Sequence, residues 1–252
     1  MSANKCDICP VKNNSNLTKM GLNIGKFDYL VALAGNPNVG KSTVFNALTG
    51  LRQHTGNWTG KTVTKAEGAF YYNEKKFKVV DLPGTYSLLS TSKDEEVARD
   101  FILFARPDVT VIVIDAAKME RNLNLVLQVL EITEKAVLCV NLIDEAERNG
   151  ITVNDKLLSE KLGIPVVLTS ARKGIGIPEI IKFIYEVASG IYVCKPHRDR
   201  KEPDEIKEAI DKISSMLKLK FPDLPNIRWV AMRILEGDHK IIEALERNEL
   251  TA

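Results

Sequence analysis

The chain has 252 residues, of which 44% are hydrophobic and 27% are charged, the proportions of an ordinary globular protein. Basic and acidic residues nearly balance, at 35 against 33, whereas a dedicated nucleic-acid binder carries a strong basic excess. The apolar runs are strand-length, short of the roughly 20 residues that cross a bilayer, and no signal peptide is visible. Four cysteines are too few for a disulfide scaffold, which indicates a reducing compartment. From these observations together we expect a soluble, cytosolic protein with no nucleic-acid partner.

Residues 1–26 are polar and show no apolar periodicity, so we expect them to form a flexible leader. The leader carries one Cys-x-x-Cys pair, Cys6 and Cys9. One pair supplies two of the four ligands that a zinc or iron–sulfur site needs. Two exposed thiols and a shared metal or redox site are therefore both open interpretations.

From residue 27 to residue 190, short β-type runs alternate with helical patterns. The strand candidates are Tyr29–Ala34, Ala66–Tyr72, Lys76–Asp81, Val109–Asp115, Ala136–Leu142 and Pro165–Thr169. The helix candidates are Lys41–Thr49, Asp94–Phe104, Leu123–Lys135, Asp155–Leu162 and Ile177–Ser189. Asn73-Glu74 predicts an antiparallel hairpin, whereas the continuous apolar runs are typical of central parallel strands. We therefore predict an α/β domain with a mostly parallel six-stranded sheet flanked by helices.

The remainder of the chain has a different pattern. We expect a linker over residues 191–203, because residues 195–203 are polar and are bounded by prolines. Apolar side chains then recur every three or four residues, at Ile206, Ile210, Ile213 and Leu217. Trp229–Leu235 resumes the pattern, and Asp238 could cap a last helix. We expect a small all-helical domain over residues 204–252. Acidic and basic residues are equal in number, 12 of each, over residues 195–252, so this part of the chain has no electrostatic footprint for nucleic acid.

A phosphate-binding motif lies between the first strand and the first helix. Gly35-Asn36-Pro37-Asn38-Val39-Gly40-Lys41-Ser42 fits the pattern GxxxxGK[ST], and Thr43 completes the predicted nucleotide-binding segment. The glycines let successive N–H groups point at phosphate oxygens, and the helix N-terminus adds partial positive charge. Lys41 would reach the β- and γ-phosphates, and the Ser42 hydroxyl would bind Mg²⁺.

A second motif, Asp81-Leu82-Pro83-Gly84, follows the strand Lys76–Asp81. An aspartate at this strand end would hold Mg²⁺ through a water, and the Gly84 N–H would bond the γ-phosphate. A DxxG pattern by itself is weak evidence for a nucleotide site, because it is commonly just a turn. The same pattern after a phosphate loop at this spacing is strong evidence.

A third motif, Asn141-Leu142-Ile143-Asp144, predicts a reader of guanine. The Asp144 carboxylate can accept from the guanine N1–H and 2-amino group, whereas adenine offers neither and would be repelled. Most GTPases carry lysine where Leu142 stands. Because the packing of that lysine over the base is missing, the affinity for guanine nucleotides is expected to be reduced. Ser170-Ala171, with Arg172 behind them, would supply a backbone N–H to guanine O6. Together the motifs predict a Ras-like P-loop GTPase domain that binds GTP and GDP.

Two segments narrow the prediction further. Gly56-Asn57-Trp58-Thr59-Gly60-Lys61-Thr62-Val63 and Asp81-Leu82-Pro83-Gly84-Thr85-Tyr86-Ser87-Leu88 resemble the two switches of the FeoB family of bacterial and archaeal ferrous-iron transport proteins. Lys61 and Thr64 depart from the family pattern. The resemblance runs from about Tyr29 to the C-terminus, and the last part is similar to that family's helical, GDI-type domain. It adds to the nucleotide-binding residues a set from the first switch, Gly60, Lys61, Thr62, Val63 and Thr64.

The resemblance implies that the chain is the cytosolic part of a cytoplasmic-membrane protein, with a transmembrane iron-permease region outside this chain. GTP binding and hydrolysis would regulate or drive Fe²⁺ uptake. A small regulatory partner protein and a homo-oligomer are compatible with it. The alternative function is a ribosome-assembly or RNA-modification GTPase, a class that normally carries a basic RNA-binding module. A further alternative is an adaptor that binds nucleotide without hydrolysing it.

The resemblance also suggests how hydrolysis would occur. Thr62 would add a second protein ligand to Mg²⁺. Thr85 stands where Ras-type enzymes place the glutamine that orients the attacking water, so hydrolysis should be slow. By resemblance, the Asn38 side chain and backbone carbonyls around residues 57–60 would bind an activating K⁺, although asparagine also suits a tight turn. The expected catalytic residues are Lys41, Asn38, Thr62 and Gly84.

Overall fold

The structure is a computed structural model that describes residues 18, 20, 22, 25–50, 53–58, 63–89, 92–197, 203–222 and 224–246. The chain divides into two compact units. One comprises Phe27–Ile102 and Pro107–Asp199, and the other includes Leu103–Arg106 and Arg200–Ala252. Cys6 and Cys9 lie outside the described residues.

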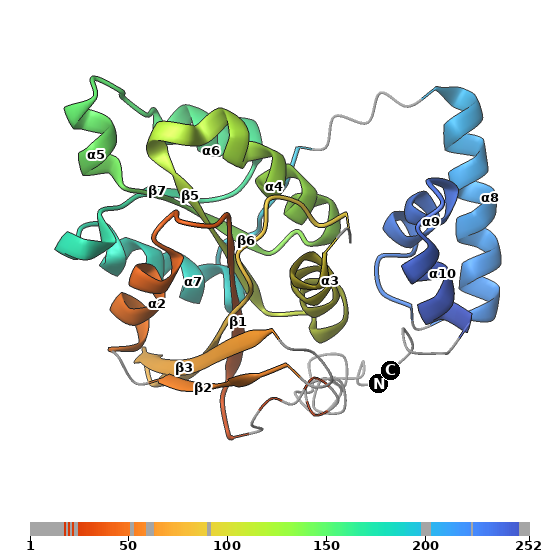
Figure 1. The fold of residues 1–252 in the computed structure, drawn as a ribbon, viewed down its shortest axis with the longest axis horizontal. Helices are drawn as coiled ribbons and strands as arrows, with labels where there is room; N and C mark the ends of the chain where they lie inside the picture. The colour runs from red at the N-terminus through yellow and green to blue at the C-terminus, as the bar shows by residue number, and fades with distance from the viewer. Residues whose placement is uncertain are drawn as a thin grey trace, which may run out of the picture. The chain divides into compact units, whose positions relative to one another are not determined.

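Within the described residues, the first unit is built on a seven-stranded sheet with the order β2-β3-β4-β1-β5-β6-β7 (Figure 1). The strands are β1 Tyr29–Gly35, β2 Gln53–Asn57, β3 Thr64–Tyr72, β4 Lys75–Asp81, β5 Val109–Asp115, β6 Ala136–Asn141 and β7 Val166–Leu168. β4, β1, β5, β6 and β7 run parallel, while β3 is antiparallel to both β2 and β4. The predicted α/β class is confirmed, and this part of the chain has one strand more than expected.

The additional strand is β2, at the edge of the sheet. Its sequence, Gln-His-Thr-Gly-Asn, contains no apolar side chain that alternation could reveal, and it is a strand because it pairs with β3. The predicted hairpin of β3 and β4 is confirmed. Asn73 and Glu74 at its turn have φ of 47° and 61°, the left-handed conformation that two-residue hairpin turns require.

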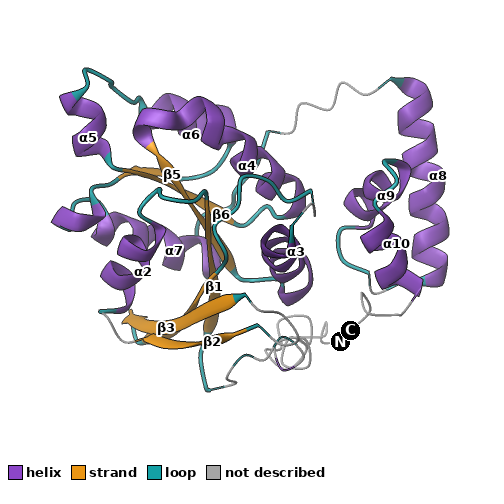
Figure 2. Ribbon diagram, in the orientation of Figure 1, coloured by secondary structure: helices purple, strands orange, loops and turns teal. Residues whose placement is uncertain are grey.

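Helices lie on both sides of the sheet (Figure 2). They are α2 Lys41–Thr49, α3 Lys93–Asp100, α4 Met119–Ile132, α5 Ile143–Arg148, α6 Asp155–Leu162 and α7 Ile177–Ala188. The helix expected over Asp94–Phe104 is in two parts, because α3 continues as a π-helix, η1 Phe101–Ala105. Local sequence sets the ends of α6, where the Asn154 side chain accepts from Leu157 N–H and Gly163 follows with φ of 70°.

The core of this unit lies between the sheet and α2 and α7 on one face, with α4 against β5 on the other (Figure 1). All seven residues of β5 are buried. Phe45 of α2 and Ile180 of α7 belong to the same apolar cluster as Val31, Leu33 and Val111 of the sheet. Because the carboxyl ends of parallel strands meet at one edge, this packing gathers the loops after β1, β4, β6 and β7.

The predicted linker begins within the first unit. Residues 191–197 form neither helix nor strand. Lys195 N–H donates to Gly163 O at 2.8 Å, and Tyr192 N–H donates to Glu186 O at 2.9 Å. These backbone hydrogen bonds tie the start of the segment to the ends of α6 and α7.

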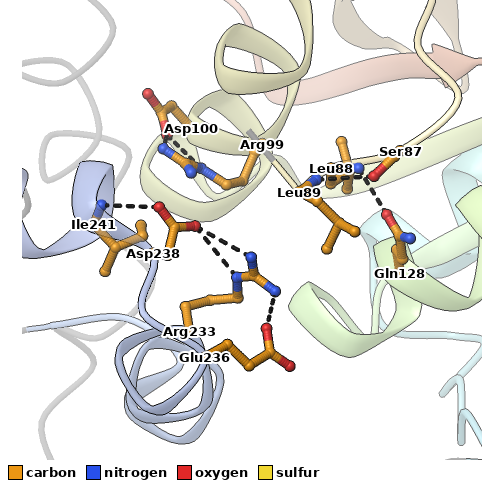
Figure 3. Close-up of polar contacts among 10 residues, drawn as sticks. All are labelled: Ser87, Leu88, Leu89, Arg99, Asp100, Gln128, Arg233, Glu236, Asp238 and Ile241. Atoms are coloured by element: carbon orange, nitrogen blue, oxygen red, sulfur yellow. Dashed lines mark hydrogen bonds and ion pairs between the residues drawn. The ribbon is translucent and has the colours of Figure 1, made fainter. Parts of the chain in front are cut away.

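The second unit contains the helices α8 Asp204–Lys220, α9 Ile227–Leu235 and α10 His239–Glu246. Apolar side chains from each helix are buried, namely Ile210, Leu217, Trp229, Val230, Ile241 and Leu245. Asp238 begins α10 as the sequence predicts: one carboxylate oxygen accepts from Ile241 N–H and the other pairs with Arg233, each at 3.3 Å (Figure 3). In the part of the chain that the structure describes, no helix combines the length and the hydropathy of a membrane span.

Candidate nucleotide-binding site

The predicted phosphate loop is a tight turn between the end of β1 and the start of α2. Asn38 and Gly40 have φ of 63° and 78°, a region that glycine enters freely and asparagine tolerates. A Cβ on Gly40 would lie 2.4 Å from Asn141 Nδ2, and one on Gly35 would lie 2.5 Å from Val113 O. A side chain at either position would clash with the neighbouring strand, so both positions of the motif require glycine.

Lys41, the first residue of α2, pairs with the carboxyl end of β4. Its Nζ donates to Asp81 Oδ1 and to Leu82 O. Burial raises the pKa of the Asp81 carboxyl, and the Lys41 ammonium opposes that effect. The Ser42 side chain, next along α2, is exposed. Hydroxyl and carboxylate oxygens are the ligands that Mg²⁺ prefers, so the predicted donor pair of Ser42 and Asp81 fits this metal.

The segment after Asp81 lies against the phosphate loop. Thr85 N–H donates to Gly35 O at 3.2 Å, and a Cβ on Gly84 would lie 3.3 Å from Pro37 Cα. The second predicted switch therefore begins in direct contact with the loop that would hold the phosphates. The predicted γ-phosphate sensor, Gly84, is next to that loop.

Further along, α4 holds this segment by two contacts. The Gln128 side chain accepts from Leu88 N–H at 2.6 Å (Figure 3). The Arg121 guanidinium lies 4.1 Å from the ring centre of Tyr86, in a cation–π arrangement. Residues 86–88 are thus attached to α4, the helix that packs against β5.

The first predicted switch is described only in part. Gly60, Lys61 and Thr62 lie outside the described residues. Trp58 N–H donates to Val63 O at 2.9 Å, which joins the two described ends of the segment. A cavity of about 450 Å³ is lined by residues of both switches and of α3: Val63, Thr64, Pro83, Gly84, Ser92, Lys93 and Asp94. A larger cavity, of about 610 Å³, lies between α6 and α7 and contains none of the predicted site residues.

Asn141, at the end of β6, links the phosphate loop to the predicted base loops. Its Nδ2 donates to Val39 O at 3.0 Å. Its Oδ1 accepts from Ala171 N–H and from Thr169 Oγ1, each at 3.1 Å. The Ala171 N–H, which we expected to meet guanine O6, is therefore engaged by Asn141 in this structure.

Asp144, the predicted guanine reader, lies in the first turn of α5 beside the loop after β7. Leu142 begins the turn with φ of 62°. Asp144 Oδ1 accepts from Ser170 Oγ at 3.0 Å, and Oδ2 lies 3.0 Å from Lys173 Nζ. The hydrogen bond from Lys173, and then the one from Ser170, lowers the pKa of the Asp144 carboxyl. The carboxylate is therefore ionised at neutral pH, as guanine recognition needs.

The structure brings together the predicted residues of four loops: 35–43, 81–84, 141–144 and 170–172. Two further residues of this region were not predicted from the sequence: Thr169, which bonds Asn141, and Lys173, which pairs with Asp144. A basic residue shortly after Ser170-Ala171 was the available signal for Lys173.

Cys139 belongs to the core and has no place in the chemistry. It is fully buried in β6, 3.2 Å from Thr169 Oγ1, and burial raises the pKa of its thiol to about 12. The prediction that Cys139 is a core residue is confirmed.

A mostly parallel sheet with helices on both faces, a phosphate loop after β1 and a guanine-type acidic motif after β6 define a P-loop GTPase domain. Family models identify it more narrowly. Residues 29–184 match the model for ferrous iron transport protein B, and residues 203–252 match that for the FeoB cytosolic helical domain. The chain belongs to the FeoB family.

A curated relative and solved structures of this family are similar to the chain over most of its length. The Fe(2+) transporter FeoB of Methanocaldococcus jannaschii is 45% identical over 222 residues, which cover 87% of this chain and 32% of that protein. The cytosolic domain of the T. maritima FeoB iron transporter in a GDP form is 40% identical, with a TM-score of 0.77, covering 87% of this chain and 85% of that one. Its GMPPNP form is 39% identical, with a TM-score of 0.76 and coverages of 85% and 84%.

The chain spans about a quarter to a third of the length of the curated relatives that it matches. Residues 203–252 match a helical domain of this family, whereas the alternative of an RNA-modification or ribosome-assembly GTPase expects a basic RNA-binding module.

Proposed function

We propose that this chain binds and hydrolyses GTP and that its nucleotide cycle regulates or drives Fe²⁺ uptake by a membrane transporter. The chain would be that transporter's cytosolic part at the cytoplasmic membrane, acting on its own iron-permease region. One observation carries the nucleotide part of the proposal: Asn141 bonds Val39 of the phosphate loop and Ala171 of the base loop, so phosphate-binding and guanine-reading groups form one connected site. Membership of the FeoB family supports the iron-transport part.

In this site the phosphate loop, residues 35–43, would surround the phosphates with backbone N–H groups. Lys41 would exchange its bond to Asp81 for one to the β- and γ-phosphates. The Gly84 N–H would bond the γ-phosphate, and Asp144 would accept from the guanine N1–H and 2-amino group. Ser42, Asp81 through water, and Thr62 would hold Mg²⁺, which supplies charge neutralisation at the phosphates.

The proposal is tested by isothermal titration calorimetry. GTP and GDP should bind, and ATP should bind at least tenfold more weakly, because the Asp144 carboxylate has no donor to accept from on adenine. Asp144→Asn should shift preference toward xanthine nucleotides, whose hydrogen-bond polarity at the affected edge is reversed. ATP affinity within tenfold of GTP would refute the assignment.

We also propose that hydrolysis is slow and stimulated by K⁺. Thr85 is too short to orient water as glutamine does. Asn38, which is exposed in the phosphate loop, offers an amide oxygen, and K⁺ held there would stabilise charge that develops between the β- and γ-phosphates. The positive φ of Asn38 is by itself a reason for asparagine at this position, so only the ion dependence separates the two interpretations.

Single-turnover hydrolysis in matched KCl and NaCl tests this. K⁺ should accelerate wild type about tenfold, equivalent to about 1.4 kcal/mol of transition-state stabilisation. Asn38→Ala should abolish the response and leave GDP affinity nearly unchanged, whereas Thr85→Ala should change the K⁺-stimulated rate little. Equal wild-type rates in the two salts would refute the K⁺ mechanism. No hydrolysis in either salt would favour the adaptor alternative.

A further inference from the structure

The guanine-reading carboxylate has a basic neighbour that does not come from its own motif. Leu142 stands where a lysine is usual, two residues before Asp144. The ammonium that approaches Asp144 belongs instead to Lys173, on the loop after β7. We propose that Lys173 is a positioning residue that holds the Asp144 carboxylate in the orientation that binds guanine. The inference rests on the proposed nucleotide site.

The two carboxylate oxygens of Asp144 are held from two directions. Ser170 Oγ donates to Oδ1 at 3.0 Å, and Lys173 Nζ lies 3.0 Å from Oδ2. A carboxylate bonded at one oxygen can still rotate about its Cβ–Cγ bond. Bonds at both oxygens, from donors on one loop, fix the plane of the group.

The backbone that carries Lys173 is itself fixed. Lys173 is the last residue of the 3₁₀ turn η3 Ala171–Lys173, and its N–H donates to Ser170 O at 2.9 Å. Gly174 follows with φ of 73°, and its N–H donates to Ala171 O at 3.2 Å. The ammonium therefore extends from a closed turn beside Ser170, so both donors to Asp144 move as one body.

This arrangement leaves the carboxylate free to bind a base. Each carboxylate oxygen has two acceptor positions, so one remains on Oδ1 for the guanine N1–H or 2-amino group, and one on Oδ2. Lys173 and guanine thus bind Asp144 together, and the ammonium offsets the charge that guanine covers. Because the Lys173 side chain is 58% exposed and that of Asp144 23%, water screens the pair and the effect on affinity is modest.

The test is calorimetry of GDP binding to the full chain. Lys173→Gln should weaken GDP about three- to fivefold, within the range of an exposed ion pair. Lys173→Arg, which keeps the charge, should restore most of the affinity. Lys156→Gln is the matched control: it removes one exposed positive charge from α6 and should bind GDP as wild type does.

A double-mutant cycle separates positioning from a general effect of charge. Asp144→Asn removes the carboxylate that Lys173 holds, so adding Lys173→Gln to it should leave xanthosine diphosphate affinity unchanged. Three results would overturn the inference while leaving the nucleotide site intact: unchanged GDP affinity in Lys173→Gln, tighter binding in that variant, or an equal loss in the Asp144→Asn background. Absence of GDP binding by wild type would overturn the proposed site and the inference together.

Discussion

At the scale of single residues, β3 and β4 contain a buried charge cluster of Glu67, Lys65 and Lys78. Glu67 Oε1 lies 3.0 Å from Lys65 Nζ, and Oε2 lies 2.7 Å from Lys78 Nζ. The three side chains are only 8–10% exposed. Burial raises the pKa of the Glu67 carboxyl, but hydrogen bonds from Lys78 and Lys65 outweigh it and leave the pKa below its usual 4.5.

A group whose pKa is lowered by folding stabilises the protein above its unfolded pKa, and this contribution disappears as the pH falls through the folded value. Glu67→Gln removes the carboxylate charge that both ammonium groups approach and should cost about 3 kcal/mol of unfolding free energy at pH 7. The difference from wild type should shrink below pH 4.5. Urea unfolding at pH 7 and pH 4 measures both quantities.

Glu160→Gln, on the exposed side of α6, is the control and should unfold as wild type does at both values. If the cost of Glu67→Gln were the same at both values, Glu67 would stabilise the sheet through packing and not through its charge.

Residue by residue, the motifs predicted Lys41, Asp81 and Asp144, because a short run of sequence specifies each of those roles. Thr169 and Lys173 could not be predicted in the same way. Each acts through Asn141 or Asp144, from a loop that begins about 25 residues later in the chain. Only the pairing of β6 with β7 brings those segments together.

At the scale of secondary-structure elements, most strands and helices with strong apolar patterns were predicted to within two residues at each end. The exception among the long helices is α4, which was expected over Leu123–Lys135 and is Met119–Ile132. β5 and α2 have the predicted bounds, because β5 is buried on both sides and α2 ends at Gly50 in the left-handed conformation. β2 and α5 were missed. β2 is polar, and α5 has only six residues, so neither contains enough apolar residues to show a period.

One element-level contact explains a glycine in a strand. Gly68 of β3 lies beneath α2, and a Cβ there would be 2.5 Å from Thr49 Cγ2 and 3.0 Å from Phe45 Cζ. Gly68→Ala should therefore force α2 away from the sheet and cost about 1–3 kcal/mol of stability. The measurement is the midpoint of urea unfolding for the variant and wild type.

Gly56→Ala is the matched control, because a Cβ on that glycine in the paired strand β2 meets only Lys65 Cε, at 3.6 Å. It should change the midpoint little. If the two variants were equally destabilised, close packing of α2 would not be the cause, because a Cβ at Gly56 meets no atom of that helix.

At the scale of the whole molecule, the predicted nucleotide site lies in one of the two units. Every described residue of the predicted nucleotide site lies in the unit of Phe27–Ile102 and Pro107–Asp199. The α8–α10 unit has its own buried core and contributes none of those residues. The sequence predicts a boundary between a nucleotide-binding part and a helical part from a proline-bounded linker and from the helical spacing of the apolar residues after it. It could not show that residues 191–197 are bonded to the first unit, because their backbone contacts leave no mark on side-chain pattern.

We therefore expect a fragment of residues 27–199 to bind GDP within about twofold of the full chain. At a GDP concentration of about 100 times Kd, binding stabilises the folded state by about 2.7 kcal/mol, which should raise the melting temperature by roughly 5–10 °C. The full chain should show a similar rise in the transition of its first unit, and Lys41→Ala should lose most of it in either form. A fragment of residues 203–252 is the control and should show no rise with GDP. A loss of more than tenfold in the affinity of the 27–199 fragment would contradict the expectation, because the helical unit would then have to support the nucleotide site directly.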